Sequence, residues 1–101
     1  MGNTAPRLVS RFDTLKFENR AEMGIGAVKF FDNGYGVSVI RGPYTYGGPE
    51  GLYELAVLRG NERDSELCYD SGITDDVMGS LSPEEVSEAM EQVANLKPRG
   101  N

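Results

Sequence analysis

Two β-rich runs joined by Asn33-Gly34 constrain the fold of this chain more than any other feature. The stretch GIGAVKFFDNGYGVSVIRG places β-branched and aromatic residues on both sides of this dipeptide. Asn-Gly favours the type I′ turn, whose twist matches that of two flanking antiparallel strands. We therefore expect a β-hairpin with strands near residues 25–32 and 35–42.

Further strands are predicted on both sides of this hairpin. The segment 14–19 (TLKFEN) indicates a short strand before it. After the segment GPYTYGGPEG, residues 52–58 (LYELAVL) form a third hairpin-connected strand, and residues 66–71 (ELCYDS) form a fourth after a polar turn. Short connections allow each strand to pair with the one before it. Alternation in strands predicts that Val37 and Val39 share one face of the sheet, opposite to Ser38 and Ile40. In the next strand Tyr53, Leu55 and Val57 suit the core face.

The C-terminal segment SPEEVSEAMEQVANL has the pattern of an amphipathic helix. Ser82 as N-cap, Pro83 at the first helical position and Glu85 three residues after the cap form a capping box. The apolar positions recur every three or four residues along one stripe. That stripe consists of Val86, Ala89, Met90, Val93 and Leu96.

These elements predict an α+β fold, with an antiparallel β-meander of about four strands and one C-terminal helix packed on a face. The length of 101 residues fits one domain. We expect a flexible N-terminal arm over residues 1–12, a single α+β domain over 13–97 and a tail over 98–101.

Composition excludes several kinds of chemistry. The chain has no histidine, so a Ser–His–Asp triad, a Cys–His pair and a zinc site of the usual ligand types are excluded. Cys68 is the single cysteine and cannot form an internal disulfide, which agrees with a reducing compartment. Its position in a predicted strand indicates a small buried apolar residue. We expect no cofactor, no metal and a cytoplasmic location.

Negative charge is concentrated in the second half of the chain. The net charge is −6, and residues 51–101 hold eleven acidic and four basic side chains. Such a surface repels nucleic acid and anionic membranes, so we expect binding to neither. Two interpretations remain open: a solvated face that keeps the protein soluble, or an acidic surface that competes with nucleic acid for a basic protein cleft. The second interpretation assigns the contact to Asp75, Asp76, Glu84, Glu88 and Glu91.

The segment 42–51 also has two interpretations. Its glycines can form a nest of amides for an anion, or a broad corner that returns one strand beside another. Tyr44 and Tyr46 are the tyrosines that we expect to be exposed, and tyrosine is enriched where proteins bind proteins. The predicted partner-binding residues are Tyr44, Tyr46, Gly47, Gly48 and Glu50.

A group of aspartates follows the fourth predicted strand. Asp70, Asp75 and Asp76 supply hard oxygen ligands of the kind that calcium and magnesium prefer, and paired carboxylates also serve as general acid and base. Their spacing does not match an EF-hand loop. The competing interpretation is that residues 74–76 cap a short helical turn beginning at Val77 and Met78.

Three stretches, FDNGYGVSVI, YTYGGPEGLYELAVL and ELCYDSGITDDVMGSLSPEEV, resemble small proteins encoded by tailed phages and prophages. The resemblance covers about residues 26 to 96. The family has no assigned activity or catalytic residues, so the resemblance implies only a context. Phage genomes encode accessory proteins that bind and redirect host proteins, including inhibitors of host defence.

From these observations we expect a non-enzymatic binding module of the phage accessory type, located in the cytoplasm of a bacterial host, that contacts another protein. One alternative is the acidic inhibitor, of the anti-defence type. A second alternative is a small hydrolase that uses carboxylates. Edge strands of the meander also give a second copy of the chain a place to pair.

Overall fold

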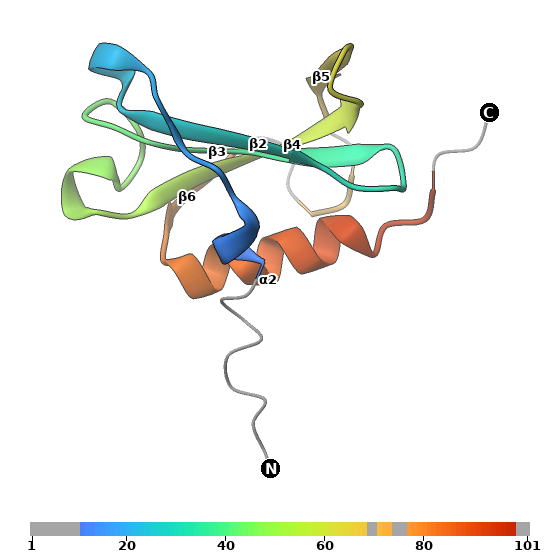
Figure 1. Cartoon of the computed structure of the whole chain (residues 1–101). Coiled ribbons are helices and arrows are strands. Elements are labelled where there is room, and N and C mark those ends of the chain that lie inside the picture. Colours follow the sequence, from blue (N-terminus) through green and yellow to red (C-terminus); the bar gives the residue numbers. More distant parts are fainter. Residues whose placement is uncertain (1–10, 69–70, 74–76, 99–101) are drawn as a thin grey trace.

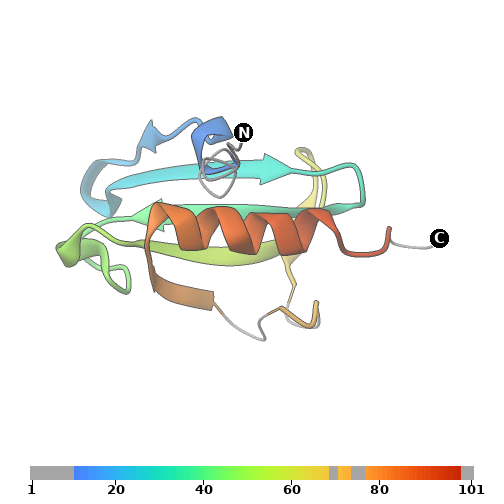
Figure 2. The ribbon, with the colours of Figure 1, turned by 90° about the horizontal axis from the view of Figure 1, so that it is seen from below.

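Figure 1 shows the computed structural model, which describes residues 11–68, 71–73 and 77–98. Its centre is an open antiparallel sheet of six strands. One helix, α2 (Pro83–Ala94), packs on one face of this sheet and runs along the strands (Figure 2). The predicted α+β class and the C-terminal position of the helix are therefore confirmed.

The strands follow chain order across the sheet up to β4. On the far edge of β4, two strands share the pairing: β5 pairs with the end of β4 at Leu58–Gly60, and β6 pairs with its beginning. The strands are β1 (Glu18–Asn19), β2 (Ile25–Phe30), β3 (Tyr35–Arg41), β4 (Tyr53–Gly60), β5 (Ser65–Leu67) and β6 (Val77–Leu81). Three short 3₁₀ helices are η1 (Phe12–Thr14), η2 (Ala21–Met23) and η3 (Gly48–Glu50).

The β2–β3 turn differs from the predicted type I′ turn. That turn needs a positive φ at both central residues, but of the pair only Gly34 has one, at 87°. The backbone N–H of Phe31 instead donates to the Tyr35 carbonyl over 2.8 Å, which closes a three-residue loop ending in a left-handed glycine. The hairpin prediction is correct, and the turn type is wrong because the Asn33 side chain is engaged elsewhere.

Two corrections concern the segment after β4. The fourth strand was predicted at 66–71, but β5 ends at Leu67, and Tyr69 and Asp70 lie outside the described residues. Val77 and Met78 were predicted to begin a helical turn, but both belong to strand β6. Pairing with β4, far away in sequence, decides their conformation. Asp75 and Asp76 lie outside the described residues.

The folded domain begins earlier in the chain than the predicted boundary at residue 13. Arg11 and Phe12, which the sequence assigned to the arm, already contact α2: the Phe12 N–H donates to Ser87 Oγ over 2.8 Å. The Phe12 ring packs edge-on against Tyr53, with ring centroids 5.1 Å apart. The predicted strand at 14–19 is reduced to its last two residues: residue 14 ends η1, and residues 15–17 have no regular secondary structure. Residues 1–10 lie outside the described part of the chain.

The core lies between α2 and the sheet face that α2 covers. Tyr53, Leu55 and Val57, the core-face positions predicted in β4, are all buried. Val37 and Val39, predicted to share one face of β3, are also buried and pair with Val57 and Leu55. The helix contributes four buried apolar residues of its predicted stripe, namely Val86, Ala89, Met90 and Val93. Burying a side chain of valine or methionine size stabilises the fold by about 1.5–3 kcal/mol.

At each end of α2, side chains form hydrogen bonds with backbone groups that have no partner within the helix. At the N-terminus the predicted capping box is present: Ser82 Oγ accepts from the Glu85 N–H, and Glu85 Oε1 accepts from the Ser82 N–H. At the C-terminus the donor is Asn33, in the β2–β3 turn. Its buried amide nitrogen lies 2.8 Å from the Val93 carbonyl oxygen and 3.1 Å from that of Leu96. Because helices leave their last carbonyls without intrahelical donors, Asn33 fastens the hairpin to the helix end.

We predict that Asn33→Asp lowers the free energy of unfolding by about 3 kcal/mol, because it replaces the donating amide by a carboxylate that faces backbone carbonyl oxygens. Denaturant unfolding monitored by circular dichroism measures the effect. Asn19→Asp is the matched control, since its exposed side-chain oxygen accepts from the Ala21 N–H and a carboxylate preserves that bond. Equal losses of stability in the two variants would contradict the role assigned to Asn33.

Candidate functional site

The segment between β3 and β4, residues 42–52, forms a corner at one end of the sheet (Figure 1, green loops at the left). We call it the tyrosine corner. Tyr44 is 79% exposed and Tyr46 is 68% exposed, as predicted. Glu50 is also exposed, whereas Gly47 and Gly48 are half-buried at the base of the corner. The five predicted contact residues therefore divide into three exposed side chains and two glycines that shape the loop.

Hydrogen bonds within the segment hold the backbone of the tyrosine corner. Thr45 is buried; its side chain accepts from the Gly42 N–H and donates to the Gly42 carbonyl, both over 3.0 Å. The Gly47 carbonyl accepts from the N–H groups of Glu50 and Leu52, over 3.0 and 2.9 Å. Backbone polar groups paired in this way fix the loop conformation without a ligand.

The tyrosine corner is also attached to β6, which is distant in sequence. The Ser80 N–H donates to the Tyr46 carbonyl over 3.0 Å, and the Tyr46 N–H donates to Glu54 Oε1, also over 3.0 Å. Ser80 has a φ of 57°, a left-handed conformation that side-chain-bearing residues adopt at a cost of about 1–2 kcal/mol. The backbone of Tyr46 is therefore held between β4 and β6.

Close approach of backbone segments explains the glycines of the corner. A Cβ atom on Gly48 would lie 1.9 Å from the Gly42 carbonyl oxygen, and one on Gly47 would lie 2.6 Å from Ser80 Cα. The amide nest has few donors left, because seven amides of the segment already donate within the protein. They belong to Gly42, Thr45, Tyr46, Gly48, Glu50, Gly51 and Leu52. The geometry favours the structural interpretation of the glycines.

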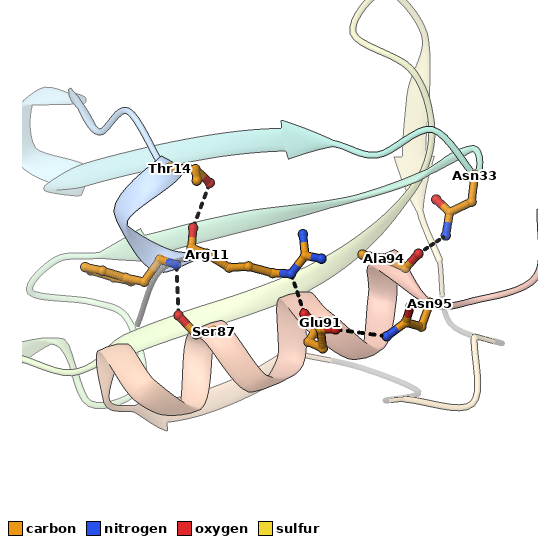
Figure 3. Close-up of polar contacts among 8 residues, drawn as sticks. Arg11, Thr14, Asn33, Ser87, Glu91, Ala94 and Asn95 are labelled. Atoms are coloured by element: carbon orange, nitrogen blue, oxygen red, sulfur yellow. Dashed lines mark hydrogen bonds and ion pairs between the residues drawn. The ribbon is translucent and has the colours of Figure 1, made fainter. Parts of the chain in front are cut away.

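The acidic surface lies on α2, on the side of the molecule away from the sheet. Glu84, Glu88 and Glu91 are all exposed. Glu91 differs from the other two because Arg11 Nε lies 2.6 Å from its Oε1 (Figure 3). The hydrogen bond from Arg11, supported by one from Asn95, lowers the pKa of the Glu91 carboxyl below 4.5. The ion pair also neutralises part of the surface that the inhibitor interpretation requires.

Other candidate groups are placed less favourably for catalysis. Cys68 is buried, as predicted, although it lies just after β5 and not within it. A shallow pocket of about 330 Å³ contains two carboxylates, Asp64 and Glu66, beside Arg59. Both carboxylates belong to exposed residues, and Glu66 Oε2 lies 3.1 Å from Arg59 Nη2. An exposed pair of carboxylates, one of them ion-paired with an arginine, does not form the enclosed site in which paired carboxylates act as acid and base.

Among the described residues, no group of three or more Cys, Asp or Glu side chains is arranged to hold a metal ion. The aspartates considered as metal ligands, Asp70, Asp75 and Asp76, lie outside those residues. The part of the chain that the structure describes also contains no helix with the length and apolar character needed to cross a membrane.

Comparison with protein-family models, curated proteins and solved structures finds no match to the chain. The site must therefore be interpreted from its own geometry.

The Arg11–Glu91 pair predicts a pH dependence of stability. A carboxyl whose pKa is lower in the folded than in the unfolded chain stabilises the fold above its unfolded pKa, and this contribution is lost as the pH falls through the folded pKa. We therefore expect Glu91→Gln to reduce the loss of stability between about pH 5 and about pH 3. Thermal unfolding at each pH measures it.

Glu88→Gln is the control, because Glu88 is an exposed glutamate on the same helix for which the described residues provide no ion pair. The Glu88 variant should keep more of the acid destabilisation of the parent protein. Coincident pH profiles for the two variants would contradict the proposed effect of Arg11 on Glu91.

Proposed function

We propose that the chain is a non-enzymatic protein-binding module, of the phage accessory type suggested by its sequence resemblance, and that it binds its partner through the tyrosine corner. The observation that carries this proposal is the high exposure of Tyr44 and Tyr46 on a loop whose backbone is held at Tyr46 and at Thr45, the residue between them. Large exposed aromatic side chains normally cost solubility, so their presence on an ordered loop favours a contact role.

The held backbone matters because binding costs free energy wherever it orders a flexible loop. Immobilising one side chain of many rotamers costs about 0.5–1.5 kcal/mol, and ordering the backbone adds to that. Bonds to Glu54 and Ser80 fix the backbone at Tyr46 before any partner arrives. Tyrosine has few rotatable bonds and offers both an apolar ring and a hydroxyl group, which suits it to anchoring a protein interface.

The acidic inhibitor is the second candidate function. The observation that favours it is the alignment of exposed Glu84 and Glu88 on the outward side of α2, joined by Glu91 one turn further on. A basic cleft on the partner would contact a row of carboxylates on the outward side of α2, away from the buried apolar stripe of the helix. Binding through such charges weakens as ionic strength rises, whereas binding through tyrosines changes much less.

An affinity capture from bacterial lysate, at low and high salt and with mass-spectrometric identification, separates the two candidates. We expect the capture to identify a partner protein that stays bound at high salt. In a titration with the purified partner, Tyr44→Ala/Tyr46→Ala should weaken binding by about 30-fold or more, as for truncated interface anchors. Glu84→Gln/Glu88→Gln should leave the affinity unchanged.

Leu67→Ala is the matched control, because it truncates an exposed apolar residue on β5, at the other end of β4 from the corner. Circular dichroism verifies that each variant is folded. A partner lost at high salt, together with weak binding by the glutamine variant, would replace this proposal with the acidic inhibitor. Full affinity in the tyrosine variant would exclude the tyrosine corner as the binding site.

A further inference from the structure

No α-helix of the described residues covers the sheet face opposite α2, although the η2 segment and β5 rise on that side at the two ends of the sheet (Figure 1). We call this sheet face the open face. Alternation along each strand places there the residues that do not point into the core. Pairing aligns them in rows across the sheet. The first row is Phe30, Gly36, Leu58 and Leu67, the second is Val28, Ser38, Ala56 and Val77, and the third includes Gly26, Ile40 and Glu54.

The first two rows of the open face contain no charged side chain, although the chain as a whole has a net charge of −6. Val28 is 48% exposed and Leu67 is 44% exposed. The Phe30 ring lies over Gly36, since a Cβ atom on Gly36 would lie 2.5 Å from Phe30 Cδ1. Leu58, at the centre of the first row, is only 8% exposed, so the apolar side chains that these rows present to water are chiefly those of Val28 and Leu67 at their ends.

The charge distribution is the observation that favours a second copy of this chain as the occupant of the open face. Two copies of an acidic protein repel each other unless their contact surface is nearly neutral. The exposed glutamates of α2 lie on the opposite side of the molecule from the open face. A contact between open faces therefore places the two sets of helix carboxylates as far apart as the molecule allows.

We propose that the open face forms a two-fold symmetric dimer interface with a second copy, independently of the tyrosine corner. The axis lies between the two sheets, parallel to the strands and midway between β3 and β4. This rotation places each β2 opposite the second copy's β5 and β6, and each β3 opposite its β4. Two sheets packed in this way form a sandwich about 10 Å thick.

The residue pattern of the rows is self-complementary under this rotation. In the second row the two outer side chains are β-branched and the two inner ones are small. Val28 therefore lies opposite Val77 of the second copy, and Ser38 lies opposite its Ala56. In the first row, Phe30 lies opposite Leu67 of the second copy. Small residues near the axis allow the two sheets to approach, while the larger ones close the interface on both sides.

Opposite charges meet at the third row. The guanidinium of Arg20 lies over Gly26, because a Cβ atom on Gly26 would be 2.7 Å from Arg20 Cζ. Glu54 points to the same face from β4, two strands away. The rotation brings each Arg20 over the sheet of the second copy. There it lies about one strand spacing, ~4.8 Å, to the side of the β4 strand that contains the second copy's Glu54. Such rim pairs fix orientation more than they add affinity.

The size of the open face limits the strength of the dimer. Four strands and three rows cover an area about 20 Å across in each direction once side chains are included. The contact then buries about 1,000 Å² in total, near the lower end for specific interfaces. We therefore expect a dimer that dissociates between about 1 µM and about 1 mM.

Sedimentation equilibrium of the full chain across that concentration range tests the proposal. We expect a reversible monomer–dimer equilibrium, and a Val28→Glu variant whose dissociation constant is about tenfold higher or more, because the interface would desolvate an added charge. Met23→Glu is the control, since it adds the same charge at a 58% exposed residue in η2, outside the rows. A monomer at every concentration, or equal effects of the two substitutions, would overturn the proposal.

Disulfide trapping tests the orientation. Val28 and Val77 lie about 14 Å apart across three strand spacings, too far for an intramolecular disulfide. Under mild oxidation, the double variant Val28→Cys/Val77→Cys should form a covalent dimer, and neither single variant should do so to the same extent. Cys68 is buried and stays in all variants as an internal control. Equally efficient cross-linking by a single variant would overturn the parallel axis.

Discussion

The packing of α2 against β3 and β4 is the interaction on which the other features of the molecule depend. Val37, Val39, Leu55 and Val57 from the sheet, with Val86, Met90 and Val93 from the helix, are almost fully buried and form a core on one side of the sheet. The chain has one long helix among its described residues, so it can cover one face only. Side chains bond to the backbone at both ends of that helix, and the Asn33 amide connects its C-terminus to the hairpin that supplies Val37 and Val39 to the core.

A core on one side gives the remaining surfaces distinct properties. The acidic residues gather on the outward side of α2, where water solvates them and where Arg11 neutralises Glu91. The open face retains apolar rows that no described helix covers. The tyrosine corner lies at an end of the sheet, where β6 and β4 both bond to the backbone of Tyr46. Each surface suits a different kind of contact, and the two that we propose to be functional meet only at Glu54, which bonds to Tyr46 and lies at the rim of the open face.

The sequence predicted correctly those elements that depend on residues close together in the chain. The alternation at Val37, Val39, Leu55 and Val57, the helix stripe and the capping box at Ser82 each depend on residues close in the chain, and all are present. Exposure of Tyr44 and Tyr46 was also predicted correctly, from their place in a glycine-rich connection. The errors involve contacts between distant segments. Val77 and Met78 are strand residues because β4 offers them an edge, and Asn33 leaves the expected turn geometry because its amide binds the helix. The attachment of the tyrosine corner to Ser80 could not be inferred because it joins residues 34 positions apart.

If the tyrosine corner is an ordered part of the folded domain, its hydrogen-bonded amides are protected in the free protein, and residue-resolved amide hydrogen exchange measures that protection. The N–H groups of Tyr46 and Leu52 donate to Glu54 and Gly47, and that of Ser80 donates to Tyr46. We expect these three amides to exchange at least about 100-fold more slowly than in an unstructured chain, as amides do where opening costs about 3 kcal/mol or more. Exchange of all three at the rates of an unstructured chain would show that the corner is not held and would rule out a pre-ordered binding loop.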